Sequence, residues 1–491
     1  MSTDLSQIER LIRIGKFSNA RFQLLQIKPR LLPREELSIY ANLTRRVGLL
    51  ARSAKALRPI IHQNSRTAIA PPAANEKAEY AATLIQLGAL DEADRLLKEA
   101  QNQAPESRLY RAIGHFRRWE HHLGIPFLLE LLDMKILGPY QETVAKINLA
   151  SAYLVCQQEV TARQLLLPLA EAKQPQDQSL IMSNIHELLG KACFALGDLV
   201  EAQKYFSSGA EFLTESSTRH SLWLKKWQTF LKAKQFPGTQ WNQDFAILRG
   251  MALELSDWDT LRDCDLYEGT SSENFELLTK VYFGTPFESY RKNILRLNPS
   301  LKEKLPVQYI WGTDASSQKN LIDLLDPKLF NSKGAARIGS NIHRLLLHMS
   351  GDFYRPFPLG SIALAIAPTP YYNHEIASNR LHNLLFRTRA WITKNNLGLT
   401  VTEKKHSYAL SPILNTGVLI RWQGRGHVDS LESVEWERLR NTIKTESFSI
   451  QDAMKILGCK STKALKILNW AVMKNLILIY GKGKNTQYHF I

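Results

Sequence analysis

Few groups of side chains in this sequence could carry out chemistry on a substrate. His121 and His122 are adjacent and His343 stands apart, so none of them has partners at the spacing of a metal site. Four aspartates lie between residues 257 and 265, but without the glycine-centred loop of a calcium site. The stretch GKGKNT lies between two expected strands, whereas a phosphate-binding loop leads into a helix. We therefore expect no enzyme activity, no metal and no cofactor.

Basic residues in the last third of the chain are better candidates, and their chemistry would be contact with a polyanion. The formal net charge is +17. Residues 326–491 hold 23 lysines and arginines against 10 acidic residues, while residues 1–325 hold 40 against 36. Charge that served solubility alone would be spread more evenly. We expect a polyanion-binding C-terminal region behind a near-neutral N-terminal region.

The candidate DNA-binding residues lie on two expected helices and two expected β-hairpins. An arginine can donate two hydrogen bonds to a guanine edge, whereas lysines and short hydroxyls suit phosphate oxygens. The candidates are Arg380, Asn383, Arg387, Arg389, Lys394, Lys404, Lys405, Lys460, Ser461, Thr462, Lys463, Lys466, Lys482 and Lys484.

A module is expected at residues 326–411. Within it, residues 337–411 read as a helix, a short helix and a long basic helix, followed by a β-hairpin. The apolar stripe of the long helix recurs in steps of four and three from Ala377 to Trp391, which leaves its basic residues on the opposite side. Apolar and polar residues alternate around Lys404 and Lys405, as a hairpin requires.

This order resembles the winged helix of OmpR-type response regulators. The resemblance implies that the third helix enters the major groove and that the hairpin, or wing, contacts the backbone or the minor groove. The sequence departs from that family at Ser407, where a glycine is usual before the tyrosine, and no receiver domain precedes the module. A winged helix that binds protein is the alternative.

A second basic module is expected at residues 430–491, after a linker at 412–429. Ser449 can cap its second helix and Gly458 can end that helix. A third helix follows, and then two strands around the tip GKGKN. This arrangement resembles a winged helix-turn-helix, which again could bind DNA or protein.

Residues 1–234 read as repeated helical hairpins. Small residues at Ala81 and Gly190 are each followed seven residues later by a turn glycine, Gly88 and Gly197, and then by alternating large and small residues. This pattern resembles the tetratricopeptide repeat, which implies a superhelix with a concave face that binds peptides or protein segments. A non-repetitive helical domain is the alternative.

Turn positions near 15, 48, 88, 157 and 197 leave one gap of 69 residues, in which we expect a degenerate repeat, and so about six hairpins in all. Residues 235–325 are expected to form a helical connector or a degenerate winged helix.

The predicted fold class is mainly α, with a helical-hairpin superhelix similar to tetratricopeptide repeats followed by two small α+β winged-helix domains. The predicted function is that of a DNA-binding transcriptional regulator whose array binds a protein or peptide partner. A non-enzymatic scaffold and an RNA-binding factor are the alternatives. Four dispersed cysteines and the lack of a signal peptide or an apolar span predict a cytoplasmic protein without a membrane partner, and a homodimer is among the expected states.

Overall fold

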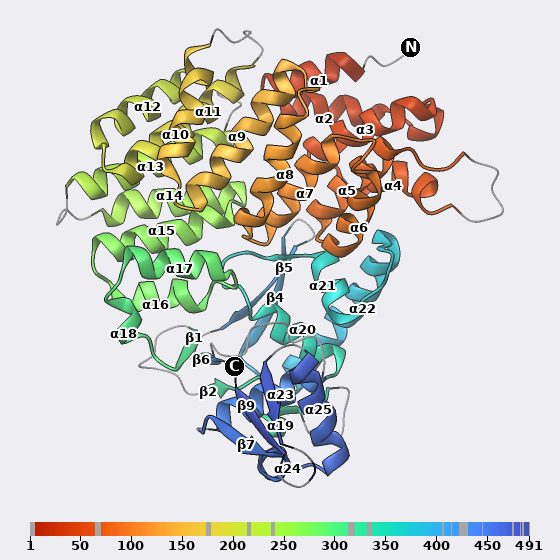
Figure 1. Cartoon of the computed structure of the whole chain (residues 1–491), viewed down its shortest axis with the longest axis vertical. Coiled ribbons are helices and arrows are strands. Elements are labelled where there is room, and N and C mark those ends of the chain that lie inside the picture. Colours follow the sequence, from red (N-terminus) through yellow and green to blue (C-terminus); the bar gives the residue numbers. More distant parts are fainter. Residues whose placement is uncertain are drawn as a thin grey trace. The chain divides into compact units, whose positions relative to one another are not determined.

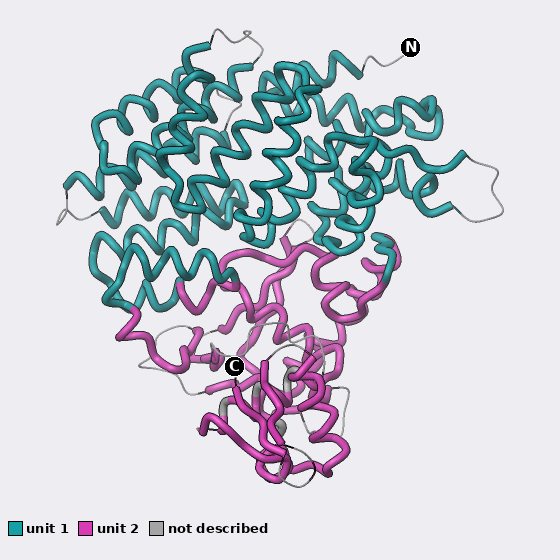
Figure 2. Tube along the Cα trace, in the orientation of Figure 1, with its two compact units in different colours: residues 1–281, 287–301, 370–374 teal, residues 282–286, 302–369, 375–491 magenta. Residues whose placement is uncertain are grey.

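The computed structural model of the chain divides into two compact units (Figure 2). Unit 1 comprises residues 1–281, 287–301 and 370–374, and unit 2 comprises residues 282–286, 302–369 and 375–491. The residues that the structure describes are 5–63, 70–172, 178–213, 218–236, 241–312, 320–330, 336–404, 407–413, 415–421, 431–443, 445–473, 476–481, 483 and 486–490.

Unit 1 consists of helices that follow one another as antiparallel hairpins (Figure 1). They are α1 (Leu5–Arg13), α2 (Phe17–Gln26), η1 (Pro29–Leu31), α3 (Arg34–Arg46), α4 (Leu50–Ile61), α5 (Ala74–Leu87), α6 (Leu90–Ala100), α7 (Glu106–Arg117), α8 (His121–Asp133), α9 (Pro139–Val155), α10 (Glu159–Glu171), α11 (Ser179–Leu196), α12 (Leu199–Glu211), α13 (Thr218–Gln235), α14 (Asn242–Leu255), α15 (Trp258–Ser271) and α17 (Glu288–Leu297). α16 (Phe275–Phe283) and α18 (Leu301–Lys304) each contain a unit boundary.

The reversals between paired helices share one backbone conformation. Every turn position predicted from the sequence has a positive φ, and at the four glycines this angle is 80°, 78°, 88° and 85°. Gln157 takes the glycine's place with φ 62°, and Trp119, with φ 59°, marks the turn of the degenerate repeat. Trp119 divides the 69-residue gap into steps of 31 and 38 residues. The prediction of six hairpins is confirmed over α1 to α12.

The same hydrogen bond closes these turns. At the α5–α6 turn, the N–H of Ala89 donates to the carbonyl of Leu84 over 2.9 Å. The N–H of Gln158 donates to the Tyr153 carbonyl over 2.8 Å in the α9–α10 turn, although no glycine is present there. This bond belongs to the Schellman motif, in which a left-handed residue ends a helix and satisfies its last carbonyls. The backbone requirement is therefore constant even where the residue type is not.

Small residues on the first helix of a hairpin make room for large residues on the second. A methyl group on Gly190 of α11 would overlap the ring of Phe206 on α12, and Phe206 is fully buried. The first helices of successive hairpins also pack on one another, as α3 does on α5 and α5 on α7. We call these first helices the inner row; α3, α5 and α7 pack in succession within it, and so do α9, α11 and α13.

Unit 2 is a mixture of short helices and three small sheets. Its elements are β1 (Gln308–Gly312), β2 (Asn320–Ile322), α19 (Pro327–Phe330), α20 (Asn341–Met349), β3 (Phe357–Pro358), α21 (Leu359–Ile366), α22 (His374–Lys394), β4 (Leu399–Lys404), β5 (Ser407–Pro412), β6 (Thr416–Arg421), α23 (Leu431–Thr442), β7 (Ser447–Ser449), α24 (Ile450–Leu457), α25 (Ser461–Met473), β8 (Ile477–Tyr480) and β9 (Gln487–Phe490).

Two segments of unit 2 repeat one order of elements. From α20 to β5, and again from α23 to β9, the order is helix, strand, helix, helix, strand, strand. The sheets match as well, with orders β3-β5-β4 and β7-β9-β8, and all their pairings are antiparallel. In both cases the last strand lies in the middle of the sheet. The chain is thus mainly α, with a helical-hairpin array and small α+β modules.

The ends of the second segment's helices agree with the sequence analysis. The Ser449 side chain accepts a hydrogen bond from the N–H of Asp452, and the Asp452 carboxylate accepts from the Ser449 N–H over 2.8 Å. These bonds form a capping box, and they lower the pKa of Asp452. Gly458 follows the helix in the left-handed conformation, with φ 59°.

For residues 235–325 the sequence analysis expected a helical connector or a degenerate winged helix. The region contains helices, but it also contains two strands. Residues 308–312 form β1, which pairs antiparallel with β6, and residues 320–322 form β2, which pairs parallel with the same strand. β6 itself lies within the expected linker 412–429. Strand pairing between residues about a hundred positions apart leaves no periodic local signal, which explains the difference.

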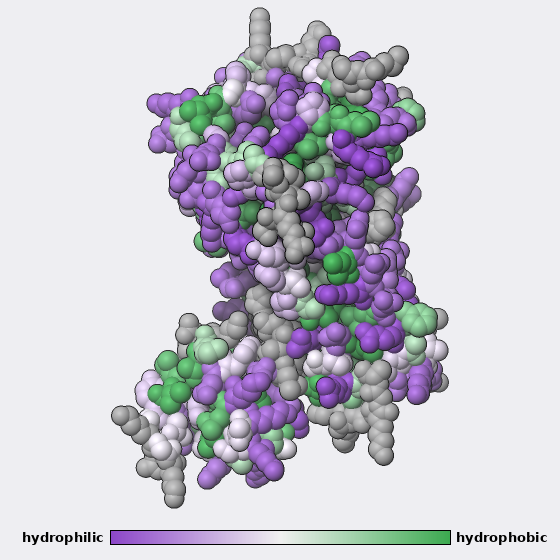
Figure 3. All heavy atoms as spheres, turned by 90° about the vertical axis from the view of Figure 1, so that its right-hand side faces the viewer, coloured by the Kyte–Doolittle hydropathy of each residue, from purple (hydrophilic) through white to green (hydrophobic). Residues whose placement is uncertain are grey.

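No helix among the described residues is both long and apolar enough to cross a bilayer. On the face drawn in Figure 3, hydrophobic residues occur in separate patches among hydrophilic ones.

Candidate nucleic-acid and partner surfaces

α22 carries the candidate residues of the first basic module. Its apolar stripe is confirmed from Leu381 onward, because Leu381, Leu384, Thr388 and Trp391 are buried, while Ala377 is half-buried. The Thr388 hydroxyl donates to the Leu384 carbonyl over 2.8 Å, so this polar group is satisfied within the helix. The buried stripe fixes which side of α22 remains exposed.

Four of the five candidates on α22 share one exposed side. Arg380, Asn383, Arg387 and Lys394 follow one another in steps of three, four and seven residues, which keeps them in line along a helix. All four are exposed, and none forms an ion pair or a side-chain hydrogen bond with another residue in the described part of the chain. Phe386 beside them is 75% exposed. We call these four residues the α22 stripe.

Arg389 does not belong to that stripe, although the sequence analysis grouped it with Arg387. Its guanidinium donates two hydrogen bonds, of 3.2 and 3.0 Å, to the carbonyl oxygen of Val401 on β4. Two residues turn a helix by roughly 200°, so neighbours at that spacing face different ways. Arg389 therefore connects α22 to the hairpin.

The hairpin of the first module is formed by β4 and β5, and Lys404 pairs with Ser407 at its end. The Lys404 side chain is exposed there, and Lys405 lies outside the described residues. Tyr408 is fully buried, and burial raises its pKa to about 12. The ring of His382 on α22 lies 3.0 Å from the Tyr408 hydroxyl, which gives the hairpin a second polar link to the helix.

In the second module, two predicted DNA-binding lysines are paired with acidic residues of α23. The Lys463 ammonium lies 2.7 Å from Glu435, and that of Lys466 lies 2.6 Å from Glu432. The Glu435 side chain is only 8% exposed, so its pair with Lys463 is partly shielded from water. Lys466 is 74% exposed, and such a pair contributes little to stability and is readily exchanged. The surface that we expected to be basic is thus partly neutralised.

The remaining candidates of the second module are only partly described. Lys460, Ser461 and Thr462 are exposed at the start of α25. Lys482 and Lys484 lie outside the described residues, although the glycines beside them, Gly481 and Gly483, have positive φ angles of 82° and 65°.

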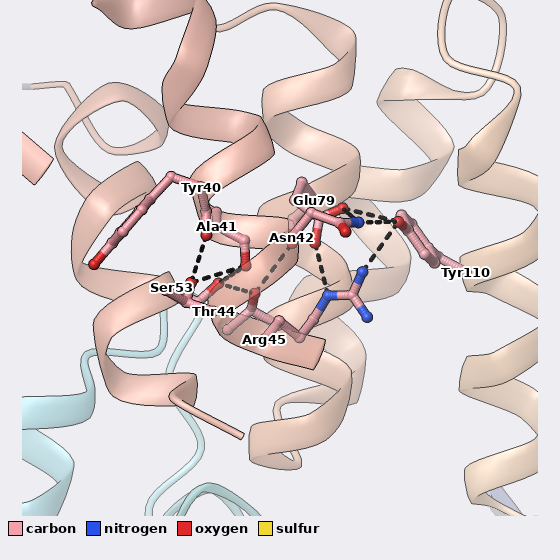
Figure 4. A network of polar contacts seen from close by, with 9 residues as sticks. Tyr40, Ala41, Asn42, Thr44, Arg45, Ser53, Glu79 and Tyr110 are labelled. Atoms are coloured by element: carbon pink, nitrogen blue, oxygen red, sulfur yellow. Dashed lines mark hydrogen bonds and ion pairs between the residues drawn. The ribbon is translucent and has the colours of Figure 1, made fainter. Parts of the chain in front are cut away.

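Unit 1 contains a buried polar network on the inner first helices that the sequence analysis did not predict (Figure 4). The Arg45 guanidinium on α3 lies 2.6 Å from the Glu79 carboxylate on α5. Glu79 also accepts from the Tyr110 hydroxyl on α7 over 2.8 Å and from the Asn42 amide over 3.0 Å. The side chains of Arg45 and Glu79 are 10% and 7% exposed. One carboxylate therefore ties three successive hairpins together.

Burial and charge act in opposite directions on this network. Burial lowers the pKa of Arg45, but Glu79 and Tyr110 both raise it, and the net shift is upward. Burial raises the pKa of Tyr110, and the Glu79 charge adds to that effect. The network therefore holds Arg45 as a cation and Tyr110 as a neutral hydrogen-bond donor.

A comparable arrangement links α13, α15 and α17. Asp263 lies 2.9 Å from the Lys226 ammonium and accepts from the Tyr290 hydroxyl over 2.8 Å. Asp263 raises the pKa of Lys226 against the effect of burial. Lys191 on α11 behaves in the opposite way, because burial lowers its pKa and its nearest acid, Glu187, lies 3.9 Å away.

A sequence signal for these networks does exist. Arg45 and Glu79 are 34 residues apart, and Lys226 and Asp263 are 37 residues apart, so each pair is separated by about one repeat. Opposite charges at equivalent positions of consecutive repeats would identify such pairs. The acidic cluster at 257–265 is accounted for in the same way, because Asp263 and Asp265 bind basic side chains.

No protein-family model matches the sequence, and no curated protein matches it. Among solved structures, the chain is similar to one described as the crystal structure of Rap protein complexed with competence and sporulation factor. The sequence identity is 12% and the TM-score is 0.42, with 79% of this chain and 98% of that chain covered.

Proposed function

We propose that this chain is a DNA-binding transcriptional regulator in which a helical-hairpin array binds a protein or peptide segment. The α22 stripe is the observation that carries the nucleic-acid part of the proposal. It presents two arginines, a lysine and an asparagine in line on an exposed helix, without acidic partners among the described residues. Arginine and asparagine are the side chains best suited to guanine and adenine edges.

The order of elements supports the assignment of both modules as winged helices. A winged helix places a hairpin after its third helix, as β4–β5 follows α22 and β8–β9 follows α25. The proposed domains are residues 326–411 and 430–491, and α22 would be the helix that enters the major groove. The charge of the last third of the chain supports the same polyanionic partner.

Binding of the full-length chain to duplex DNA at several salt concentrations tests this proposal. We expect binding that weakens as salt rises, because lysine and arginine displace counterions from phosphates. Arg387→Ala should weaken binding, whereas Lys16→Ala, which removes a charge far away in the sequence, should not. Absence of binding at low salt would overturn the proposal, and a preference for structured RNA over duplex would favour the RNA-binding alternative.

The array is proposed to bind its partner on the inner row of first helices. These helices carry the buried networks of Arg45 and Lys226, which fix neighbouring hairpins in register and leave a preformed surface. Lys191 adds a basic side chain whose ion pair with Glu187 is long, at 3.9 Å. A segment that carries a carboxylate would suit this position.

A second candidate function, protein binding, is favoured for the second module by its edge strand. β8 lies at the edge of its sheet, and Leu478, Ile479 and Tyr480 on it are 49%, 46% and 54% exposed. Exposed edges with apolar side chains are sites where another chain can add a strand. A partner captured by the full chain despite nuclease treatment, and lost with Ile479→Lys, would establish this function for the module.

A further inference from the structure

The short segment between α21 and α22 groups with the helices of unit 1, although both of those helices belong to unit 2 apart from the first residue of α22. This segment is Pro370–His374, and it contains two consecutive tyrosines. It is held by residues that lie about 280 positions earlier in the chain.

Backbone groups of the segment are bound by two side chains of α6. The Glu92 carboxylate accepts a hydrogen bond from the N–H of Tyr372. The Arg95 guanidinium donates to the Pro370 carbonyl over 2.7 Å. These bonds use backbone atoms on both sides of Tyr371, so they fix the path of the chain and not merely one side chain.

Aromatic contacts add to the backbone bonds. The Arg95 guanidinium lies over the Tyr371 ring at 4.9 Å, and the imidazole of His62 meets the same ring edge-on at 4.9 Å. Tyr372 is 3% exposed. A cation over an aromatic ring contributes about 0.5–1 kcal/mol at exposed sites.

The residues that bind the segment, at the C-terminal end of α4 and on α6, also contact one another. His62 Nε2 lies 2.9 Å from Glu92 Oε1, and the Glu92 side chain is only 3% exposed. Glu92 therefore has a defined position next to Tyr372, and a buried carboxylate that lost the N–H would lose one of its partners at a cost. His62, Glu92 and Arg95 together make a site for a short segment with an aromatic residue.

We infer that His62, Glu92 and Arg95 form a clamp that binds Pro370–Tyr372 and fixes the chain directly ahead of α22. The clamp holds the residues from which α22 begins, so a partner that displaced His62 or α6 would release those residues. The clamp itself does not depend on the proposed nucleic-acid function. A role for the clamp in regulating DNA binding would rest on that function.

Hydrogen–deuterium exchange of the full-length chain tests the clamp directly, because the Tyr372 amide is one of the bonded groups. We expect the peptide that covers residues 368–376 to be protected in the natural chain. Tyr371→Ala and Arg95→Ala should each increase its exchange rate several-fold, while peptides from α6 keep their protection. Tyr371→Ala alters only the bound segment, so a folding defect of the array cannot produce the result.

Arg118→Ala is the matched control, because Arg118 forms an exposed ion pair with Asp91 at the start of the same helix, α6. It should leave exchange of residues 368–376 unchanged. Equal exchange in the natural chain, Tyr371→Ala and Arg95→Ala would overturn the clamp. Since the readout involves no nucleic acid, this failure would be distinct from a failure to bind DNA.

Discussion

Arg387 and Arg389 are two residues apart on α22 but differ in their contacts. Arg389 donates two hydrogen bonds to the Val401 carbonyl, whereas Arg387 is exposed on the α22 stripe. Two arginines of one helix therefore have different roles. Arg389 supports the hairpin, and Arg387 faces outward.

The first prediction separates these roles by substitution. Arg387→Ala should weaken duplex binding by roughly 1–3 kcal/mol, which is about five- to 150-fold, if it contacts a base edge, and leave the melting temperature unchanged. Arg389→Ala should lower the free energy of unfolding by about 1 kcal/mol through its lost hydrogen bonds. Binding titrations and thermal melts of both variants distinguish the two effects, and an unstable Arg387→Ala variant would contradict the assignment.

The second prediction concerns close packing inside a hairpin. Gly190→Ala should destabilise the array by about 1–3 kcal/mol, because the added methyl group overlaps the buried Phe206 ring. Gly250→Ala on α14 is the matched control, since nothing lies within 4 Å of its added methyl group. That control should stabilise the helix by about 0.5–1 kcal/mol. Urea unfolding followed by circular dichroism gives both values.

The third prediction concerns the buried network of the array. Glu79→Leu leaves the Arg45 guanidinium buried without its carboxylate, which should lower the free energy of unfolding by about 3–5 kcal/mol. Replacing both residues, with Arg45→Met and Glu79→Leu, should restore part of the loss. Asp91→Ala breaks an exposed pair and should cost less than about 1 kcal/mol. Equal losses from Glu79→Leu and Asp91→Ala in urea unfolding would show that the network is dispensable.

The fourth prediction follows from a buried histidine in the first module. His343 Nδ1 accepts from the N–H of Gly339 over 3.0 Å, and Nε2 lies 2.9 Å from the Leu324 carbonyl, so the neutral ring fits both partners. Burial lowers the pKa of His343 to about 4, below its ordinary value of 6.5. Between these values the unfolded chain binds more protons, so stability rises with pH.

Lowering the pH from 7 towards 4 should therefore remove up to about 3 kcal/mol at this residue. The melting temperature of His343→Asn should depend less on pH over this range than that of the natural chain. His122→Asn, at an exposed histidine, is the control and should follow the natural chain. Parallel pH profiles for His343→Asn and the natural chain would contradict the prediction.

Local patterns predicted the array well because a helical hairpin is specified within about one repeat. The turn positions were found from glycines and small residues, and Gln157, where glycine is usual, was placed at the correct turn from the small residues Ala150 and Ala162 on either side of it. The buried stripe of α22 and the cap at Ser449 follow the same logic, since both depend on residues three or four positions apart.

Long-range pairing was not predictable in the same way. β6 takes partners from both β1 and β2, and the expected linker gave no sign of this role. The candidate surface on α25 changed for a similar reason, because the partner of Lys463 is Glu435 on another helix. A basic residue on an exposed helical side is available only if no acid from elsewhere reaches it.

The sequence alone determined the succession of helical hairpins, their turn residues and the concentration of positive charge in the last third of the chain. These features depend on composition and on spacings within one helix or one repeat. Only the tertiary structure decided which of those charges remain unpaired and where the segment ahead of α22 is bound. Those outcomes depend on contacts between residues that lie 28 to 280 positions apart, and local periodicity does not predict such contacts.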